Sequence, residues 1–166
     1  MTAAPLPEPT KPGQESVWDY PRPPRIKEFV GSITVELGGH TIASTNRAWR
    51  ILETSHPPAY YLPRESFADG SLRAATGSSW CEWKGRARYY DLVTATTSAP
   101  AAAWSYDDPT PPYRAIAGAI AVMAALVDRC TVNGEQVLAQ PGGFYGGWIT
   151  SWVAGPFKGM PGSERW

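Results

Sequence analysis

The sequence has few residues of the kinds that bind structural metals or form disulfides. Its 166 residues include two cysteines and two histidines. Cys81 and Cys130 form no Cys-x-x-Cys pair, and His40 and His56 are separated in the sequence, so four ligands at known metal-site spacings are lacking. We therefore expect two free thiols, no bound metal and no cofactor.

The sequence also lacks net charge and a membrane-directing segment. Fifteen basic and fifteen acidic side chains cancel, so no overall positive potential would concentrate polyanions at the surface. The N-terminal stretch MTAAPLPEPTKPGQES has neither a basic leader nor a long apolar run. We expect a cytoplasmic protein whose partners are neither nucleic acid nor membrane.

What the sequence does contain is enough apolar material for one domain. Hydrophobic residues make up 43% of the chain and aromatic residues 12%. Residues 1–16 carry four prolines and few apolar side chains, which predicts a flexible arm. Residues 131–166 combine many glycines with six aromatic side chains, so this tail is expected to pack on the domain or on a second subunit of a homodimer.

The local patterns predict mostly strands. SITVELGGHTIA (32–43) alternates β-branched and polar residues around two glycines, as in a tight hairpin. AYYL (59–62) suits a strand between prolines, and WCEWKGRARYYDLVT (80–94) reads as strand, glycine break and strand. YRAIAGAIAVMAALVDRC (113–130) predicts one long helix, apolar nearly all round and therefore buried on several faces or packed on a second copy. The predicted fold class is mainly β with one long helix, α+β.

Several separate motifs occur in a recognisable order: ITVELGGHTIASTNRAWRILET, PPAYYLPRES, WCEWKGRARYYDL, and AAAWSYDDP followed by the predicted helix. Together they resemble the bacterial family catalogued as domain of unknown function 427, over residues 17–130. The resemblance implies a β-tent-like fold, in which two small antiparallel sheets meet at an angle with the helix attached.

A nucleotidyltransferase label is sometimes attached to that family, and the sequence allows a test of it. Polymerase-type nucleotidyltransferases need a Gly-Ser followed by two carboxylates one residue apart, which hold two metal ions. Gly77 and Ser78 are followed by Asp91, but the partner position is occupied by Val93. The residues do not favour this activity.

Cys81 is the candidate nucleophile. Lys84, Arg86 and Arg88 follow it, and a neighbouring positive charge favours the reactive thiolate. In a continuous strand Cys81 and Lys84 would point to opposite faces, unless the break at Gly85 intervenes. Two interpretations stay open, a thiol in a ligand pocket and an inert thiol in the core.

A second group of residues is suited to binding a small anion with a flat part. Arginine offers a planar fork for carboxylate or phosphate, and aromatic rings offer stacking faces. The candidate ligand-binding residues are Arg47, Tyr60, Tyr61, Arg64, Trp83, Lys84 and Trp104. The alternative is that the arginines form ordinary surface ion pairs. Glu53 and His56 are candidates for acid–base work, although His56 could simply be a solvated loop residue.

Two functions follow from these observations. The first is a pocket for a small anionic or nucleotide-like ligand, with chemistry at Cys81. The alternative is a non-enzymatic binding or assembly module that dimerises through the predicted helix and the aromatic tail.

Overall fold

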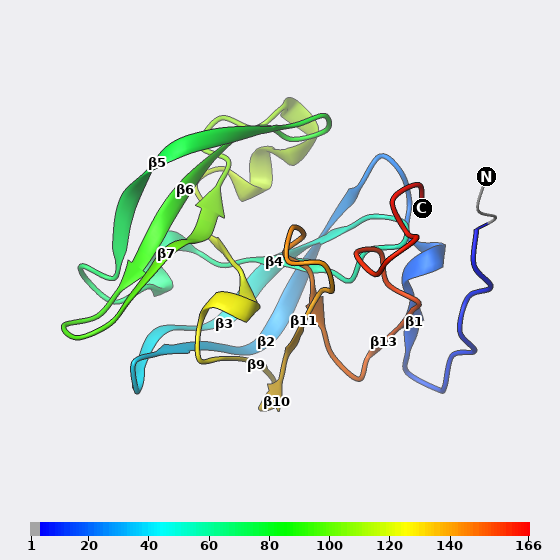
Figure 1. Ribbon diagram of the computed structural model, residues 1–166, viewed down its shortest axis with the longest axis horizontal. Helices are drawn as coiled ribbons and strands as arrows, with labels where there is room; N and C mark the ends of the chain where they lie inside the picture. The colour runs from blue at the N-terminus through cyan, green and yellow to red at the C-terminus, as the bar shows by residue number, and fades with distance from the viewer. Residues whose placement is uncertain (1–3) are drawn as a thin grey trace.

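The computed structural model describes residues 4–166 as a mainly β protein (Figure 1). One sheet contains β2 (Arg25–Leu37), β3 (His40–Leu52), β4 (Ala59–Tyr61), β9 (Arg129–Val132) and β10 (Glu135–Gln136). The other contains β5 (Leu72–Cys81), β6 (Gly85–Val93), β7 (Ser98–Ser105) and β8 (Ala121–Val122). Their strand orders are β10–β9–β2–β3–β4 and β5–β6–β7–β8, and every neighbouring pair is antiparallel.

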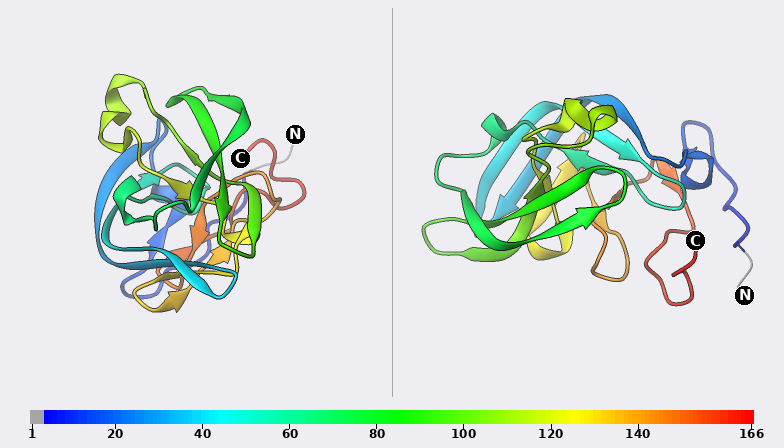
Figure 2. Two further views of the ribbon diagram at one scale, coloured as in Figure 1. Left: turned by 90° about the vertical axis from the view of Figure 1, so that its left-hand side faces the viewer. Right: turned by 90° about the horizontal axis from the view of Figure 1, so that it is seen from above.

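The segments that flank these sheets form short elements of their own. β1 (Glu15–Ser16) runs parallel to β13 (Val153–Ala154), and β11 (Leu138–Ala139) is antiparallel to β12 (Trp148–Ile149). The short 3-10 helices are η1 (Val17–Asp19), η2 (Arg64–Ser66), η3 (Pro111–Ile116) and η4 (Ala124–Leu126). The N-terminal segment that begins at residue 4 and the C-terminal tail lie at the same end of the molecule (Figures 1 and 2). Within residues 4–166, no helix has the length and apolar character needed to cross a membrane.

The β2–β3 hairpin forms where the glycine pair predicted it. Gly38 and Gly39 both have positive φ values, 60° and 79°, as a two-residue hairpin turn of the primed type requires. Ile33, Val35 and Leu37 alternate along β2 and are almost fully buried, so one face of the hairpin belongs to the core.

The predicted helix 113–130 is wrong, and with it the α+β fold class and the β-tent with an attached helix. The segment instead passes through η3, β8, η4 and the start of β9. Gly118 interrupts it with φ 73°, outside helical geometry. Val122 pairs with Ala103 of β7, and Cys130 pairs with Val35 of β2. Sheet pairing with distant strands therefore overrides the local helix propensity of an alanine-rich segment.

The two sheets meet where β4 approaches the segment that leads into β8. Leu62 and Ile120 exchange two backbone hydrogen bonds of 2.8 Å, and β8 is the edge strand of the second sheet. The first core cluster includes Ile33, Val35, Leu62, Leu92, Ile120, Val122 and Trp148. The second core cluster comprises Ile51, Tyr61, Ala87, Tyr106, Tyr113, Ile116, Ala119 and Ala121. Both sheets contribute to each cluster, so their relative position is fixed by burial of apolar surface.

The N-terminal segment lies along the C-terminal tail. The Glu8 amide donates to the Gly155 carbonyl over 2.8 Å, and the Glu15 amide to the Trp152 carbonyl over 2.8 Å. Tail residue Trp148 is 1% exposed, and its indole Nε1 donates to the carbonyl of Val122 over 2.9 Å. These contacts connect both flanks to the sheets, while the flexibility of residues 1–16 in solution stays a prediction; residues 1–3 lie outside the described range.

Candidate functional site

A tight turn between β5 and β6 places a lysine beside the cysteine. Cys81 pairs with Gly85 across the hairpin, so residues 82–84 form the turn. Thr110 holds this turn, because its amide donates to the Lys84 carbonyl over 3.1 Å and its hydroxyl to the Trp83 carbonyl over 2.5 Å. In a continuous strand Cys81 and Lys84 would point to opposite faces, and this turn removes that constraint.

Lys84 lies among aromatic side chains from both sheets. Its ammonium nitrogen is 5.4 Å from the ring centroid of Tyr106, which lies directly after β7. The Tyr106 and Tyr61 rings are 6.3 Å apart, and Trp104 Nε1 donates to the Tyr61 hydroxyl over 3.1 Å. We call this group the Lys84 cluster: Tyr61, Cys81, Lys84, Trp104, Tyr106 and Tyr113.

The cluster holds a charged amine next to phenol groups. Burial opposes the charge of Lys84, but the neighbouring Tyr61, Cys81 and Glu53 outweigh burial and raise its pKa, so the amine stays cationic. Burial raises the pKa of Tyr106, and the adjacent Tyr61 and Cys81 add to that shift. Cys81 itself is partly exposed rather than sealed in the core. Lys84 is therefore suited to hold an anion and not to act as a neutral amine nucleophile.

A second polar group lies around His56, in the segment between β3 and β4. His56 Nε2 is 3.5 Å from a Glu53 oxygen, and its Nδ1 is 3.0 Å from Gln140 Nε2. The Tyr145 ring packs edge-on against the imidazole with centroids 4.8 Å apart, and the Lys158 ammonium is 5.7 Å from the Tyr145 ring centroid. We call Glu53, His56, Gln140, Tyr145 and Lys158 the His56 group.

The two groups are neighbours. A Cβ built on Gly146 of the tail would lie 2.1 Å from the Trp104 ring, so this glycine permits direct packing of the tail on the Lys84 cluster. Burial lowers the pKa of His56 to about 4, and the positive charges of Lys158, Arg22 and Lys84 contribute to that shift. At neutral pH the His56 imidazole is consequently uncharged and lies in a positive electrostatic potential.

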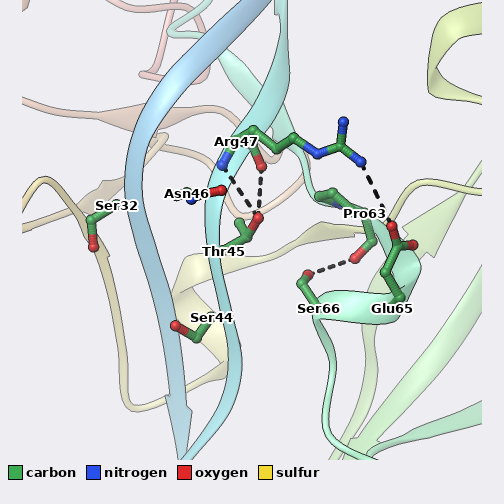
Figure 3. A pocket seen from close by; sticks show the side chains of 8 residues that line it. All are labelled: Ser32, Ser44, Thr45, Asn46, Arg47, Pro63, Glu65 and Ser66. Carbon is green, nitrogen blue, oxygen red and sulfur yellow. Dashed lines mark hydrogen bonds and ion pairs between the residues drawn. The ribbon is translucent and has the colours of Figure 1, made fainter.

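Arg47 lies elsewhere, in an open cleft on the β2–β3 hairpin (Figure 3). This cleft has a volume of about 540 Å³ and is lined by Ser32, Ser44, Thr45, Asn46, Arg47, Pro63, Glu65 and Ser66. Figure 3 shows the Arg47 guanidinium reaching toward Glu65, with a closest nitrogen–oxygen distance of 3.9 Å. Both side chains are largely exposed, so the pair adds little stability.

Arg64 and Tyr60 make their contacts with residues outside the Lys84 cluster. Arg64 donates to the Tyr90 hydroxyl over 2.8 Å and is 3.7 Å from Asp107. Tyr60 and Tyr61 are consecutive on β4, so they point to opposite faces, and Tyr60 stacks on Trp148 with centroids 5.1 Å apart.

The structure thus brings together Tyr61, Cys81, Lys84 and Trp104, with half-buried Trp83 packed against the second core cluster and with Glu53 and His56 beside them. Sequence reasoning missed Tyr113 as a member of the cluster, and Gln140, Tyr145 and Lys158 as partners of His56. Tyr106 lies two residues after Trp104 and therefore on the same strand face, and the sequence allows the same two interpretations for both residues, a core position or a pocket wall. The tail residues had no detectable sequence signal, since tertiary packing alone places them. Within residues 4–166, no three His, Cys, Asp or Glu side chains lie close enough to hold a metal ion.

Comparison with known proteins adds one match. Residues 25–133 match a family described as a domain of unknown function, DUF427. The matched range contains all of the Lys84 cluster, together with Glu53 and His56, and it ends before Gln140. No curated protein matches the chain.

Proposed function

Because the chain belongs to the DUF427 family, whose description assigns no activity, we propose a function from its own residues: binding of a small anionic ligand with a flat part at the Lys84 cluster. The cluster offers a cation and several aromatic faces in one place, which is the combination that such a ligand needs.

One observation carries this proposal. The Lys84 side chain is half-buried, with its ammonium near phenol and thiol groups, and within residues 4–166 no carboxylate oxygen lies within the ion-pair distance of 4.0 Å from that ammonium. A cation in such a low-dielectric environment attracts an anion more strongly than a solvated cation does. The neighbouring aromatic rings would stack on a flat ligand and exclude water from its charged end.

Cys81 gives this site a candidate reaction. Its thiol lies beside the Tyr106 hydroxyl within the cluster, so it would be within reach of an activated carbon–carbon double bond in a ligand bound at Lys84. The S–C bond would form as the π bond breaks, and the thiol proton would pass to the other carbon. We propose that this occurs in the reducing cytoplasm, where the thiol stays free. A Cys81→Ser variant should bind the ligand as well as the wild type but form no covalent adduct with it by mass spectrometry.

The test of binding uses three probes that differ in their flat part: inorganic phosphate, benzoate and adenosine monophosphate. Ligand-observed NMR and tryptophan fluorescence titration would compare the wild type with Lys84→Met and with the control Lys11→Met, which removes an exposed lysine. We expect Lys84→Met to weaken binding by about tenfold or more, which corresponds to one lost charged contact. Equal affinity in the two variants, or no binding of any probe by the wild type, would refute the proposal.

A homodimer stays a separate prediction. The helix on which it partly depended is not formed, so its remaining basis is the aromatic tail. The large apolar residues exposed there are Leu138, Phe144, Trp152 and Met160. Light scattering of the wild type and of a Trp152→Ser variant would test whether these residues join two copies.

A further inference from the structure

We propose that the cleft around Arg47 binds a small zwitterion, namely a polar α-amino acid, whose carboxylate contacts Arg47 and whose ammonium contacts Glu65. The cleft has a volume of about 540 Å³, which lies within the range of small-molecule sites. This site is separate from the Lys84 cluster, so the inference goes beyond the function proposed there.

The cleft lies where a bulge interrupts the β2–β3 ladder. Gly31 and Ser32 of β2 together face one residue of β3. The Ser32 amide donates to Asn133 Oδ1 over 2.9 Å, and the Asn133 amide donates to the Ser32 carbonyl over 2.7 Å. A Cβ on Gly31 would lie 2.6 Å from Asn133 Oδ1 and 2.7 Å from the Phe29 ring, so a side chain there would displace both neighbours. Specific contacts therefore hold the bulge, and bulges re-aim side chains next to binding sites.

The backbone on each side of the cleft is held independently of the charged side chains. The Thr45 hydroxyl donates to the Arg47 carbonyl over 3.0 Å and accepts from the Arg47 amide over 3.3 Å (Figure 3). On the other side, the Pro63 carbonyl accepts from the Ser66 amide over 3.0 Å and from the Ser66 hydroxyl over 2.5 Å, which fixes η2. Replacing the Arg47 or Glu65 side chain therefore leaves these backbone contacts in place.

The Arg47–Glu65 pair leaves both charged ends free for a ligand. Its closest nitrogen–oxygen distance is 3.9 Å, which is longer than a hydrogen bond. Neither charged end forms a hydrogen bond within residues 4–166. Neighbouring Arg64 turns instead toward Tyr90 and Asp107. The Arg47 guanidinium thus keeps its donors for a carboxylate, and the Glu65 oxygens can accept from an ammonium.

Charge and lining together indicate the class of ligand. One cation and one carboxylate line the cleft, and a zwitterion complements both, whereas a simple anion or cation complements one and is repelled by the other. An α-amino acid carries its two charged groups on one carbon atom, which suits protein charges whose closest atoms are 3.9 Å apart. The other lining residues are three serines, a threonine, an asparagine and a proline. Their hydroxyl and amide groups favour a polar side chain on the ligand.

The experiment compares L-serine with two analogues that each lack one charge: 3-hydroxypropanoate, without the ammonium, and ethanolamine, without the carboxylate. At about pH 6.5 the charged groups of these probes are ionised. NMR titration of the ¹⁵N-labelled full-length protein would follow the backbone amides of residues 44–47 and 64–66, which report on this cleft. Glucose serves as an uncharged probe rich in hydroxyl groups.

The variants separate the two charges. Arg47→Gln removes the guanidinium, Glu65→Gln removes the carboxylate, and the double variant Arg47→Glu with Glu65→Arg exchanges them. The matched control is Arg129→Gln, because Arg129 forms a pair with Glu36, 3.7 Å apart and also partly exposed, outside the cleft lining. Circular dichroism would verify that each variant is folded.

We expect the wild type to bind L-serine about fivefold more tightly than either analogue, as for one additional exposed charged contact. Arg47→Gln should bind L-serine no better than ethanolamine, and Glu65→Gln should bind it no better than 3-hydroxypropanoate. The exchanged double variant should keep the preference for L-serine, because the zwitterion can bind in the reverse orientation. Arg129→Gln should behave like the wild type.

The opposite outcomes would overturn the inference. If 3-hydroxypropanoate binds the wild type as tightly as L-serine does, the cleft is an anion site. If glucose shifts these amides and L-serine does not, it is a site for neutral polyols. Single variants that retain the wild-type preference, or a folded double variant that has lost it, also contradict the zwitterion. Because neither Arg47 nor Glu65 belongs to the Lys84 cluster, each of these results leaves the function proposed there unchanged.

Discussion

Replacing Glu15 by glutamine should destabilise the protein by about 2–3 kcal/mol, because the change removes the negative charge that balances a buried arginine. Arg50 of β3 is 9% exposed, and its two terminal nitrogens donate to the two Glu15 oxygens over 2.9 and 3.4 Å. The Tyr20 hydroxyl also donates to Glu15, over 3.0 Å. Glutamine keeps the shape of the Glu15 side chain, but its amide accepts only part of these hydrogen bonds and carries no charge.

The magnitude follows from the burial of each partner. Removing one partner of a fully buried ion pair costs about 3–5 kcal/mol, because the other charge stays buried without compensation. The Glu15 side chain is 37% exposed, so water partly screens the pair and the estimate is reduced to about 2–3 kcal/mol. The Nε atom of Arg50 already lacks a hydrogen-bond partner within the described structure, so Arg50 has few other contacts that could replace the loss of Glu15.

Urea unfolding followed by circular dichroism would measure this change. We expect Glu15→Gln to lower the midpoint without changing the slope with denaturant, and to lower Tm by roughly 4–12 °C for a domain of this size. The matched control is Glu65→Gln, the same substitution in an exposed pair with Arg47. It should cost no more than about 0.5 kcal/mol.

The pH dependence gives a second check. Burial opposes the charge of Glu15, but the hydrogen bond and charge of Arg50 outweigh burial and lower its pKa in the folded protein. A carboxyl with a lowered folded pKa stabilises the protein above its unfolded pKa, and this contribution is lost as pH falls through the folded pKa. The difference between wild type and Glu15→Gln should therefore be full at neutral pH and shrink below about pH 4. A Glu15→Gln protein as stable as Glu65→Gln, or a difference that persists in acid, would refute this reasoning.

Three further predictions concern the buried residues. Trp148→Ala should cost about 3–5 kcal/mol in urea unfolding, since it removes a fully buried indole, and a cost below about 1 kcal/mol would mean that the tail is not part of the core. Burial raises the pKa of Cys130 to about 12. A thiol reagent at mildly alkaline pH should therefore modify Cys81 in the native protein and Cys130 only after unfolding. Peptide mass mapping would show which cysteine is modified. The pKa of His56 is lowered to about 4, so at pH values between 6.5 and 4 the folded protein binds fewer protons there than the unfolded chain. The free energy of unfolding should therefore fall by about 2–3 kcal/mol as pH drops from 6.5 to 4. His56→Gln should remove this loss, whereas the same change at exposed His40 should not.

Local sequence signals predicted the hairpins. Gly38 and Gly39 supply the positive φ values that a two-residue turn needs, and no distant residue is required for that choice. A break between two strands was likewise predicted at Gly85; the turn itself occupies residues 82–84, directly before that glycine, which begins β6. The membership of the DUF427 family also followed from motifs, and the match over residues 25–133 confirms it.

The helix 113–130 shows where local signals fail. Its alanine-rich composition favours a helix, but Val122 and Cys130 find strand partners in two different sheets. Those partners lie elsewhere in the sequence, at Ala103 and Val35, and Val122 and Cys130 are almost fully buried where they pair with them. Periodicity in one segment contains no information about partners that the rest of the chain supplies.

Sequence signals account for some residues of the candidate site, and only the tertiary structure accounts for the others. The sequence by itself determined which side chains each motif supplies and where the chain turns, and it predicted Cys81, Lys84 and Trp104 as candidate site residues on that basis. The tertiary structure alone decided that Tyr61 joins them while neighbouring Tyr60 stacks on Trp148, since the side of β4 that faces each core depends on how the two sheets meet. It also placed Lys158 beside His56, because the order of residues along a chain does not specify where a tail with little regular structure will pack.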